Sequence, residues 1–184
     1  MRKGITEKLR DQTPDLREQR SRRIQETLVS SAEFRKAGTV MSYVATDTEV
    51  DTAYLNEKVL EAGKKLVVPV IDAKHQITIA SELKSIKDLV KGPYGIYEPK
   101  DGLMKQTAVE DIDLIVAPAI AYDRQNMRLG RGKGYYDKFF AGAPLRDTVT
   151  VGLAFHFQVV DFLPTDPHDK AVSKVITDKI SPEN

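Results

Sequence analysis

Apolar and polar positions along the chain form two kinds of pattern: helical spacing, which predicts helices, and short apolar runs, which predict strands. Over residues 15–30, Ile24 and Leu28 lie four positions apart and arginines crowd the other side, as in an amphipathic helix. Thr13 and Pro14 precede it as an expected N-cap and first helical residue. We interpret the charged side as a solvated face, which carries Arg17, Arg20, Arg22 and Arg23. A second helix is predicted over residues 51–62, with Gly63 as its cap.

Short apolar runs predict strands at residues 39–44, 66–71, 75–80, 114–118 and 149–154. Residues 92–99 are punctuated by glycine and proline and are predicted to form a loop. Strands that alternate with helices indicate an α/β fold whose sheet is largely parallel and covered on both faces. No linker divides the sequence, so we expect residues 1–184 to form a single domain.

The amino-acid composition excludes several classes of function. Among 184 residues, 41% are hydrophobic, which suffices for a core, and 28 basic residues balance 27 acidic ones. A net charge of +1 gives no reason to expect a nucleic-acid partner. The absence of cysteine excludes disulfides, zinc thiolates and a thiol nucleophile. No apolar run approaches a membrane span, so we expect no membrane partner and a cytoplasmic location.

The most informative segment is residues 128–137, with the sequence RLGRGKGYYD. Glycines alternate in it with basic residues: Gly130, Gly132 and Gly134 with Arg128, Arg131 and Lys133. Glycines let a backbone approach a ligand closely, and cations near a helix N-terminus favour a phosphate. The following tyrosines offer flat surfaces for a ring, and Asp137 could face a divalent metal. The segment therefore predicts a site for a nucleotide triphosphate or a phosphorylated intermediate.

Other interpretations of this segment are weaker. Its spacing is neither that of a P-loop nor that of the dinucleotide-binding fingerprint. A flexible, solvated glycine–arginine loop stays open as an alternative. The flanks argue against it, because a buried strand is expected at residues 114–118 and Tyr136, Phe139 and Phe140 follow at near-helical spacing. A strand, an irregular loop and a helix start make up a common ligand site in α/β proteins.

Because of residues 128–137, the chain resembles the 5-formyltetrahydrofolate cyclo-ligase family, also called methenyltetrahydrofolate synthetases. Further matching segments occur in the same order along nearly the whole chain: residues 49–52, 95–99, 113–118, 122–123, 163–164, 168–169 and 175–177. The resemblance implies a three-layer Rossmann-like fold, related to ribose-5-phosphate isomerase and CoA-transferases. It also implies ATP- and Mg²⁺-dependent conversion of 5-formyltetrahydrofolate to 5,10-methenyltetrahydrofolate, with ADP and phosphate as products.

The resemblance also implies site residues. Arg131 and Tyr135 would be catalytic, with Arg131 as the main cation at the transition state. The ATP-binding positions would be Arg2, Lys3, Arg128, Leu129, Gly130, Arg131, Gly132, Lys133, Gly134, Tyr135 and Tyr136. Two alternatives stay open: Arg128 could instead pair with Asp123 or Asp137, and Lys133 could be solvated.

Folate and metal positions follow in the same way. The substrate-binding residues would be Thr46, Glu49, Asp51, Arg131 and Tyr135, and the metal ligands Asp137 and Asp169. Asp51 could instead cap the helix that begins near Thr52. We interpret His168 as a packing or surface residue, and the role of Glu98 is left open between a turn and the metal site.

One departure from the family pattern concerns its opening Lys-x-x-Leu-Arg motif. The family arginine aligns with Arg2, whereas its lysine would precede Met1, and Lys3 and Lys8 are out of register. We therefore expect a weaker contact with ATP at this end. An alternative function is a catalytically silent folate- or nucleotide-binding protein of the same fold. We expect a monomer in either case.

Overall fold

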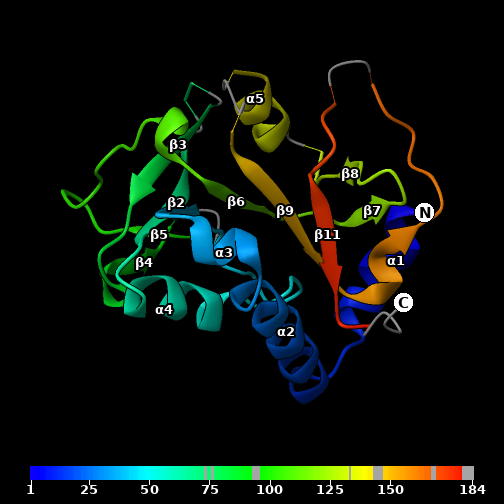
Figure 1. The fold of residues 1–184 in the computed structure, drawn as a ribbon. Helices are drawn as coiled ribbons and strands as arrows, with labels where there is room; N and C mark the ends of the chain where they lie inside the picture. Colours follow the sequence, from blue (N-terminus) through cyan, green and yellow to red (C-terminus); the bar gives the residue numbers. More distant parts are fainter. Residues whose placement is uncertain are drawn as a thin grey trace.

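The main sheet of the computed structural model, which describes residues 1–72, 74–75, 77–92, 96–132, 134–142, 147–166 and 169–179, has the strand order β11-β9-β6-β1-β2-β3 (Figure 1). Its strands are β1 (Thr39–Met41), β2 (Lys65–Asp72), β3 (Ile77–Glu82), β6 (Leu114–Ala117), β9 (Val149–Ala154) and β11 (Lys174–Thr177). Neighbours from β11 to β2 are parallel, and β3 is antiparallel to β2. The expected, largely parallel α/β sheet is confirmed.

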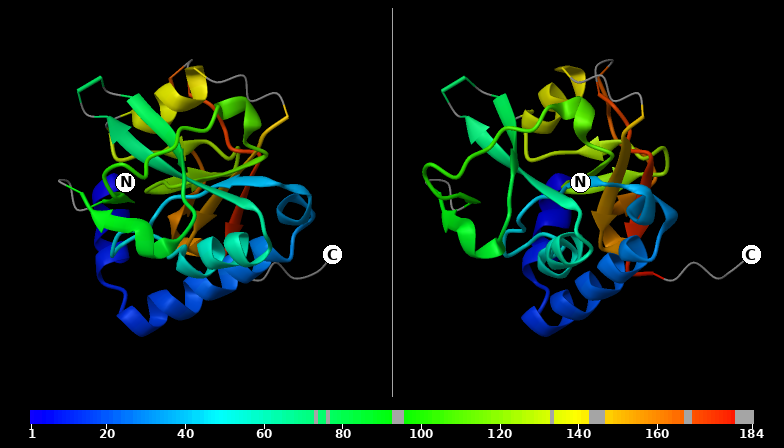
Figure 2. Two further views of the ribbon diagram at one scale, coloured as in Figure 1. Left: turned by 90° about the vertical axis from the view of Figure 1, so that its left-hand side faces the viewer. Right: turned by 60° about the vertical axis from the view of Figure 1, so that its left-hand side comes forward.

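Helices cover both faces of this sheet. Alternate strand residues point to opposite sides, so Val40 packs in one hydrophobic cluster and Met41 in another. The first cluster includes side chains from α1 (Arg2–Arg10), α2 (Pro14–Val29), α3 (Ala32–Lys36) and α4 (Ala53–Glu61). The second includes side chains from α5 (Tyr135–Gly142). Figure 2 shows α5 on the side of the sheet opposite α2 and α4.

The predicted helices form close to their expected bounds. The Thr13 hydroxyl accepts a hydrogen bond from the Leu16 amide at 3.3 Å, and Pro14 opens α2, as the local sequence predicts. Helix α4 is followed by Gly63 at a φ of 68°, a left-handed conformation that glycine adopts without a Cβ clash. None of the helices in the described ranges is long and apolar enough to cross a membrane.

The predicted strands form with small shifts, and one predicted loop needs a correction. Strand β9 has its expected bounds, β1 ends at Met41, and β3 begins two residues later than expected. Within the expected loop at residues 92–99, β5 (Tyr97–Pro99) pairs antiparallel with β4 (Leu89–Lys91). Proline is tolerated at the end of this short edge strand. The glycines and prolines of the local sequence suggested a loop because they give no sign of the pairing with β4. Residues 93–95 lie outside the described residues.

A smaller sheet positions the start of residues 128–137, which we call the glycine segment. It consists of β7 (Ala121–Asp123), β8 (Arg128–Leu129) and β10 (Val159–Val160), and 3₁₀ turns lie at Ile86–Asp88, Val109–Asp111 and His156–Gln158. The buried Asp123 carboxylate accepts hydrogen bonds from the amides of Gln125, Met127 and Leu163. These bonds fix the turn between β7 and β8, from which the glycine segment continues.

Candidate active site

The glycine segment joins β8 to the first turn of α5. Gly132 has a φ of 91° and Gly134 a φ of 67°, conformations that residues with a Cβ rarely adopt. The backbone therefore favours glycine at these two positions. Lys133, which we expected to bind ATP, lies outside the described residues.

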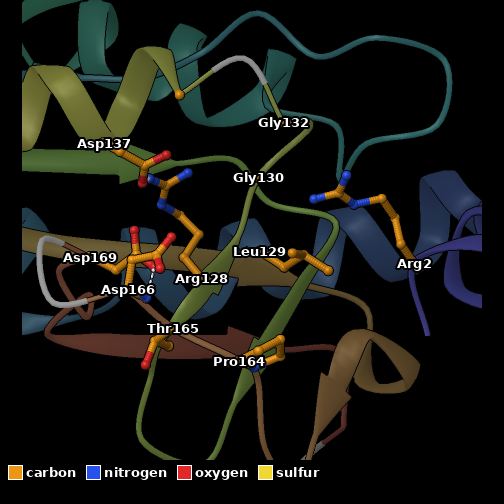
Figure 3. Close-up of a pocket in the computed structure, with 11 residues that line it drawn as sticks. Arg2, Arg128, Leu129, Gly130, Gly132, Asp137, Pro164, Thr165, Asp166 and Asp169 are labelled. Carbon is orange, nitrogen blue, oxygen red and sulfur yellow. Dashed lines mark hydrogen bonds and ion pairs between the residues drawn. The ribbon is translucent and has the colours of Figure 1, made fainter.

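One side of the segment forms a cavity of about 420 Å³, which we call the polar pocket (Figure 3). Its wall combines glycines, charged side chains and part of the chain after β10: Arg2, Arg128, Leu129, Gly130, Gly132, Gly134, Asp137, Pro164, Thr165, Asp166 and Asp169. In Figure 3, Arg2 enters from the side opposite Asp166 and Asp169. The start of α1 therefore meets the glycine segment, as the assignment of Arg2 requires.

Arg128 is buried in the wall of this pocket. Its side chain is only 3% exposed and forms an ion pair with the Asp137 carboxylate. The rings of Tyr136 and Phe140 lie 5.6 and 5.4 Å from its guanidinium carbon. Of the two carboxylates left open as partners, the structure therefore pairs Arg128 with Asp137. The Nε of Arg128 is buried and makes no hydrogen bond within the described structure.

The other side of the segment forms a second cavity of about 420 Å³, which we call the apolar pocket. Aliphatic and aromatic side chains dominate its wall: Tyr43, Val44, Pro69, Ile71, Ile96, Tyr97, Pro118, Ala119, Tyr135 and Tyr136. Thr46, Glu49, Thr78 and Arg131 add polar groups. Four residues of the glycine segment and α5 line both cavities: Arg128, Gly130, Gly134 and Asp137. The two pockets therefore adjoin.

Arg131 reaches across the apolar pocket to the segment after β1. Its guanidinium donates a hydrogen bond to the Thr46 hydroxyl at 3.1 Å and lies 3.0 Å from the Glu49 carboxylate. The second oxygen of Glu49 accepts hydrogen bonds from the Thr46 amide and hydroxyl, both at 2.9 Å. The structure thus brings together three of the residues assigned to folate.

Tyr135 and Tyr136 both line the apolar pocket and are absent from the described lining of the polar pocket. The Tyr136 hydroxyl is buried and has no hydrogen-bond partner among the described residues. Burial strongly raises the pKa of Tyr136, and the nearby Glu49 carboxylate raises it further. Tyr136 therefore stays a neutral hydroxyl.

Asp51 and Lys3 lie apart from these cavities, since neither belongs to the described lining of either pocket. The Asp51 carboxylate accepts a hydrogen bond from the Ala53 amide at 2.9 Å, at the first residue of α4. The N-cap residue of α4 is Thr52, which makes no side-chain capping bond, so Asp51 contacts the start of the helix from one residue before the cap position.

The two residues assigned to a metal face the same cavity. Asp137 and Asp169 both line the polar pocket, and the Asp169 carboxylate accepts a hydrogen bond from the Asp166 amide at 2.8 Å. Within the described residues, no group of three or more His, Asp or Glu side chains could hold a metal ion. Magnesium commonly binds one or two carboxylates together with substrate phosphates, so this pair fits an ion that arrives with a nucleotide. His168 lies outside the described residues, and Glu98 lies opposite Val90 in the β4–β5 pair.

The interpretation of the α2 arginines as a solvated face is wrong for Arg17. Its Nε donates to the Glu49 carbonyl at 2.9 Å, and its terminal NH₂ donates to the Thr46 carbonyl at 3.0 Å. Arg22 instead stacks on the Tyr54 ring at 3.8 Å. These partners are distant in sequence, and helical periodicity carries no signal that would identify them.

A mostly parallel α/β sheet that holds a charged pocket, lined by two arginines and three aspartates, beside an aromatic pocket is typical of an enzyme that acts on small molecules. The family model that matches this chain supplies the particular family. The model of the 5-formyltetrahydrofolate cyclo-ligase family matches residues 1–178, and the chain belongs to this family.

Curated relatives and solved structures agree with this assignment. The 5-formyltetrahydrofolate cyclo-ligase of Escherichia coli (strain K12) is 27% identical over 177 residues, which cover 94% of this chain and 96% of the relative. The Mus musculus protein of the same name is 25% identical over 184 residues, which cover 96% of this chain and 91% of the relative. The Aquifex aeolicus 5,10-methenyltetrahydrofolate synthetase structure superposes with a TM-score of 0.83 at 32% identity. The match covers 97% of this chain and 88% of the Aquifex aeolicus chain.

Proposed function

We propose that this protein converts 5-formyltetrahydrofolate to 5,10-methenyltetrahydrofolate and uses ATP, which becomes ADP and phosphate. The family supports this reaction, and one structural observation carries it to this chain. The polar and apolar pockets share Arg128, Gly130, Gly134 and Asp137, so ligands in the two pockets would meet at the glycine segment. Phosphoryl transfer requires such contact between donor and acceptor.

The chemistry explains why two substrates must meet. A formamide is a poor electrophile because its nitrogen lone pair is delocalised onto oxygen. In the proposed first step, the formyl oxygen attacks the γ-phosphorus of ATP, and the bond to the ADP oxygen breaks. N10 then attacks the formyl carbon within the same molecule and loses its proton, and phosphate leaves with the electron pair of the carbon–oxygen bond. Holding these atoms in place supplies much of the acceleration.

In this proposal the triphosphate occupies the polar pocket. Arg2 and the backbone amides of the glycine segment contact the phosphates. Asp137 and Asp169 would hold Mg²⁺ together with phosphate oxygens. When bound, the ion neutralises charge on the phosphates.

The folate occupies the apolar pocket, against Tyr135 and Tyr136. Thr46 and Glu49 offer acceptors for the polar groups of a pterin. Arg131 already contacts this pair and is exposed, so it can leave Glu49 for the transferring phosphoryl group. A cation there stabilises the charge that develops during the transfer.

An absorbance assay for the methenyl product tests the proposal. Purified protein, 5-formyltetrahydrofolate, ATP and Mg²⁺ should give the product, and omission of ATP should abolish it. Product formed without ATP, or none with every component, would contradict the proposal. Binding of both ligands without product would support a catalytically silent binding protein instead. A cytoplasmic location and a monomeric state stay predictions, which cell fractionation and light scattering can check.

A further inference from the structure

A row of polar side chains on α2 holds the segment that carries Thr46 and Glu49. Arg17, Ser21 and Gln25 lie four residues apart and therefore share one face of the helix. Ser21 and Gln25 are buried, with 1% and 3% exposure, although polar groups are seldom buried without partners. All three side chains bond backbone groups of the chain after β1.

These bonds follow the segment in order. Arg17 donates to the carbonyls of Thr46 and Glu49. Further along, the Ser21 hydroxyl accepts a hydrogen bond from the Asp51 backbone amide at 3.0 Å. The side-chain oxygen of Gln25 accepts one from the Leu55 backbone amide at 2.9 Å. Backbone from Thr46 to Leu55 is thus fixed to one helix, and Arg17 holds the end nearest the apolar pocket.

The bonds of Arg17 enclose a tight turn. The Glu49 amide donates to the Thr46 carbonyl at 3.2 Å, and Arg17 bonds that same carbonyl and the Glu49 carbonyl. A guanidinium presents several donors in a rigid fork, so one side chain can hold both ends of the turn. The Glu49 side chain then faces the pocket, where it meets Arg131 at 3.0 Å.

We propose that Arg17 is a positioning residue of the active site. It sets the turn from Thr46 to Glu49 so that the Glu49 carboxylate and Arg131 meet in the apolar pocket. Arg17 is not in the described lining of either pocket, so it acts through the turn and touches neither substrate. This role rests on the proposed function, because it assigns the turn to folate binding.

Steady-state kinetics of Arg17→Ala test the role. The folate KM should rise about tenfold, whereas the ATP KM should stay within about twofold, because the turn contacts the folate pocket alone. Guanidinium chloride at low concentration should restore part of the lost folate affinity to this variant. A side chain that only stabilised the fold would show neither the selective KM effect nor the rescue.

Arg23→Ala is the matched control, since Arg23 lies on the exposed side of the same helix. A folate KM for Arg17→Ala within twofold of that control, or equal changes in both KM values, would overturn the role. If circular dichroism shows that Arg17→Ala does not fold, Arg17→Lys decides: a single ammonium cannot hold both carbonyls in the same way, so an unchanged folate KM would overturn the role. Lack of product with the wild-type protein would instead contradict the proposed function itself.

Discussion

Arg128 and Arg131 lie three residues apart, and the structure gives them opposite environments. The Arg128 side chain is 3% exposed and pairs with Asp137, so removing it would leave an unpaired carboxylate in the pocket wall. The Arg131 side chain is 57% exposed, and its pair with Glu49 is easily exchanged. Burial therefore separates the two roles that one motif suggests: Arg128 shapes the pocket, and Arg131 is available to the phosphoryl group.

Arg131→Ala should lower kcat about 10²–10³-fold, as the loss of a transition-state charge contact does in other enzymes. The methenyl assay measures this loss. Arg124→Ala is a suitable control, because Arg124 forms a surface ion pair with Asp161, with side chains 74% and 86% exposed. A kcat for Arg131→Ala equal to that of the control would remove Arg131 from its proposed role.

At the scale of elements, close packing between β7 and β9 joins the two sheets. The buried Tyr122 side chain of β7 lies against Gly152 of β9, and its hydroxyl donates to the Ala117 carbonyl at 2.6 Å. A Cβ at Gly152 would overlap the Tyr122 ring. The absence of a side chain at this position thus lets an aromatic ring bridge the smaller sheet and the main sheet.

Gly152→Ala should lower the free energy of unfolding by about 1–3 kcal/mol, because an overpacked core must shift. Gly4→Ala is the contrasting variant. Gly4 lies within α1 with no atom near its would-be Cβ, so alanine there should stabilise by roughly 0.5–1 kcal/mol. Urea denaturation measures both changes, and equal effects of the two variants would contradict the packing argument.

A second link between elements joins α3 to β11. The Lys174 ammonium lies 2.6 Å from the Glu33 carboxylate, and their hydrogen bond lowers the pKa of Glu33 from 4.5 to about 2. Because the folded pKa is depressed, the stabilisation is present above pH 4.5 and is lost as the pH falls toward 2.

Glu33→Gln should therefore flatten the acid side of the stability profile. At neutral pH, the free energy of unfolding of this variant should be lower than that of the wild type by less than about 1 kcal/mol, because solvent-accessible ion pairs contribute little. The difference should vanish near pH 2. Thermal unfolding between these pH values measures it, with the exposed Glu57→Gln as a control. A difference that persists at the lowest pH would assign the effect to packing.

At the scale of the whole molecule, the polar pocket joins three distant parts of the chain. Arg2 comes from the start of α1, Arg128 and Asp137 begin and end the glycine segment, and Asp169 follows β10. A Cβ at Gly132 would lie 3.4 Å from a terminal nitrogen of Arg2, so the two segments are in close contact. Folding of the sheet is what brings these groups together.

Arg2→Ala should raise the ATP KM several-fold and leave the folate KM nearly unchanged, because Arg2 lines only the polar pocket of the two. Initial-rate kinetics with each substrate varied in turn provide the measurement. Lys3→Ala is the matched control, since Lys3 lies outside the described lining of both pockets. If Lys3→Ala raised the ATP KM more than Arg2→Ala, the sequence alignment at this end would need revision.

The sequence alone determined the features that depend on neighbouring residues. Thr13 and Pro14 start α2, Gly63 follows α4, and glycine occupies the two positions of the glycine segment that have a positive φ, Gly132 and Gly134. Caps, hydrophobic periodicity and backbone freedom act over a few residues, so local sequence is enough to predict them.

Tertiary structure alone decided which distant groups meet. Arg128 pairs with Asp137, Arg131 meets Thr46 and Glu49, and Arg17 holds the turn that ends at Glu49. Each choice was made by packing between elements, which selects one partner among several of similar chemistry. The adjoining pockets arise for the same reason, since their walls come from strands and loops whose proximity exists only in the folded sheet.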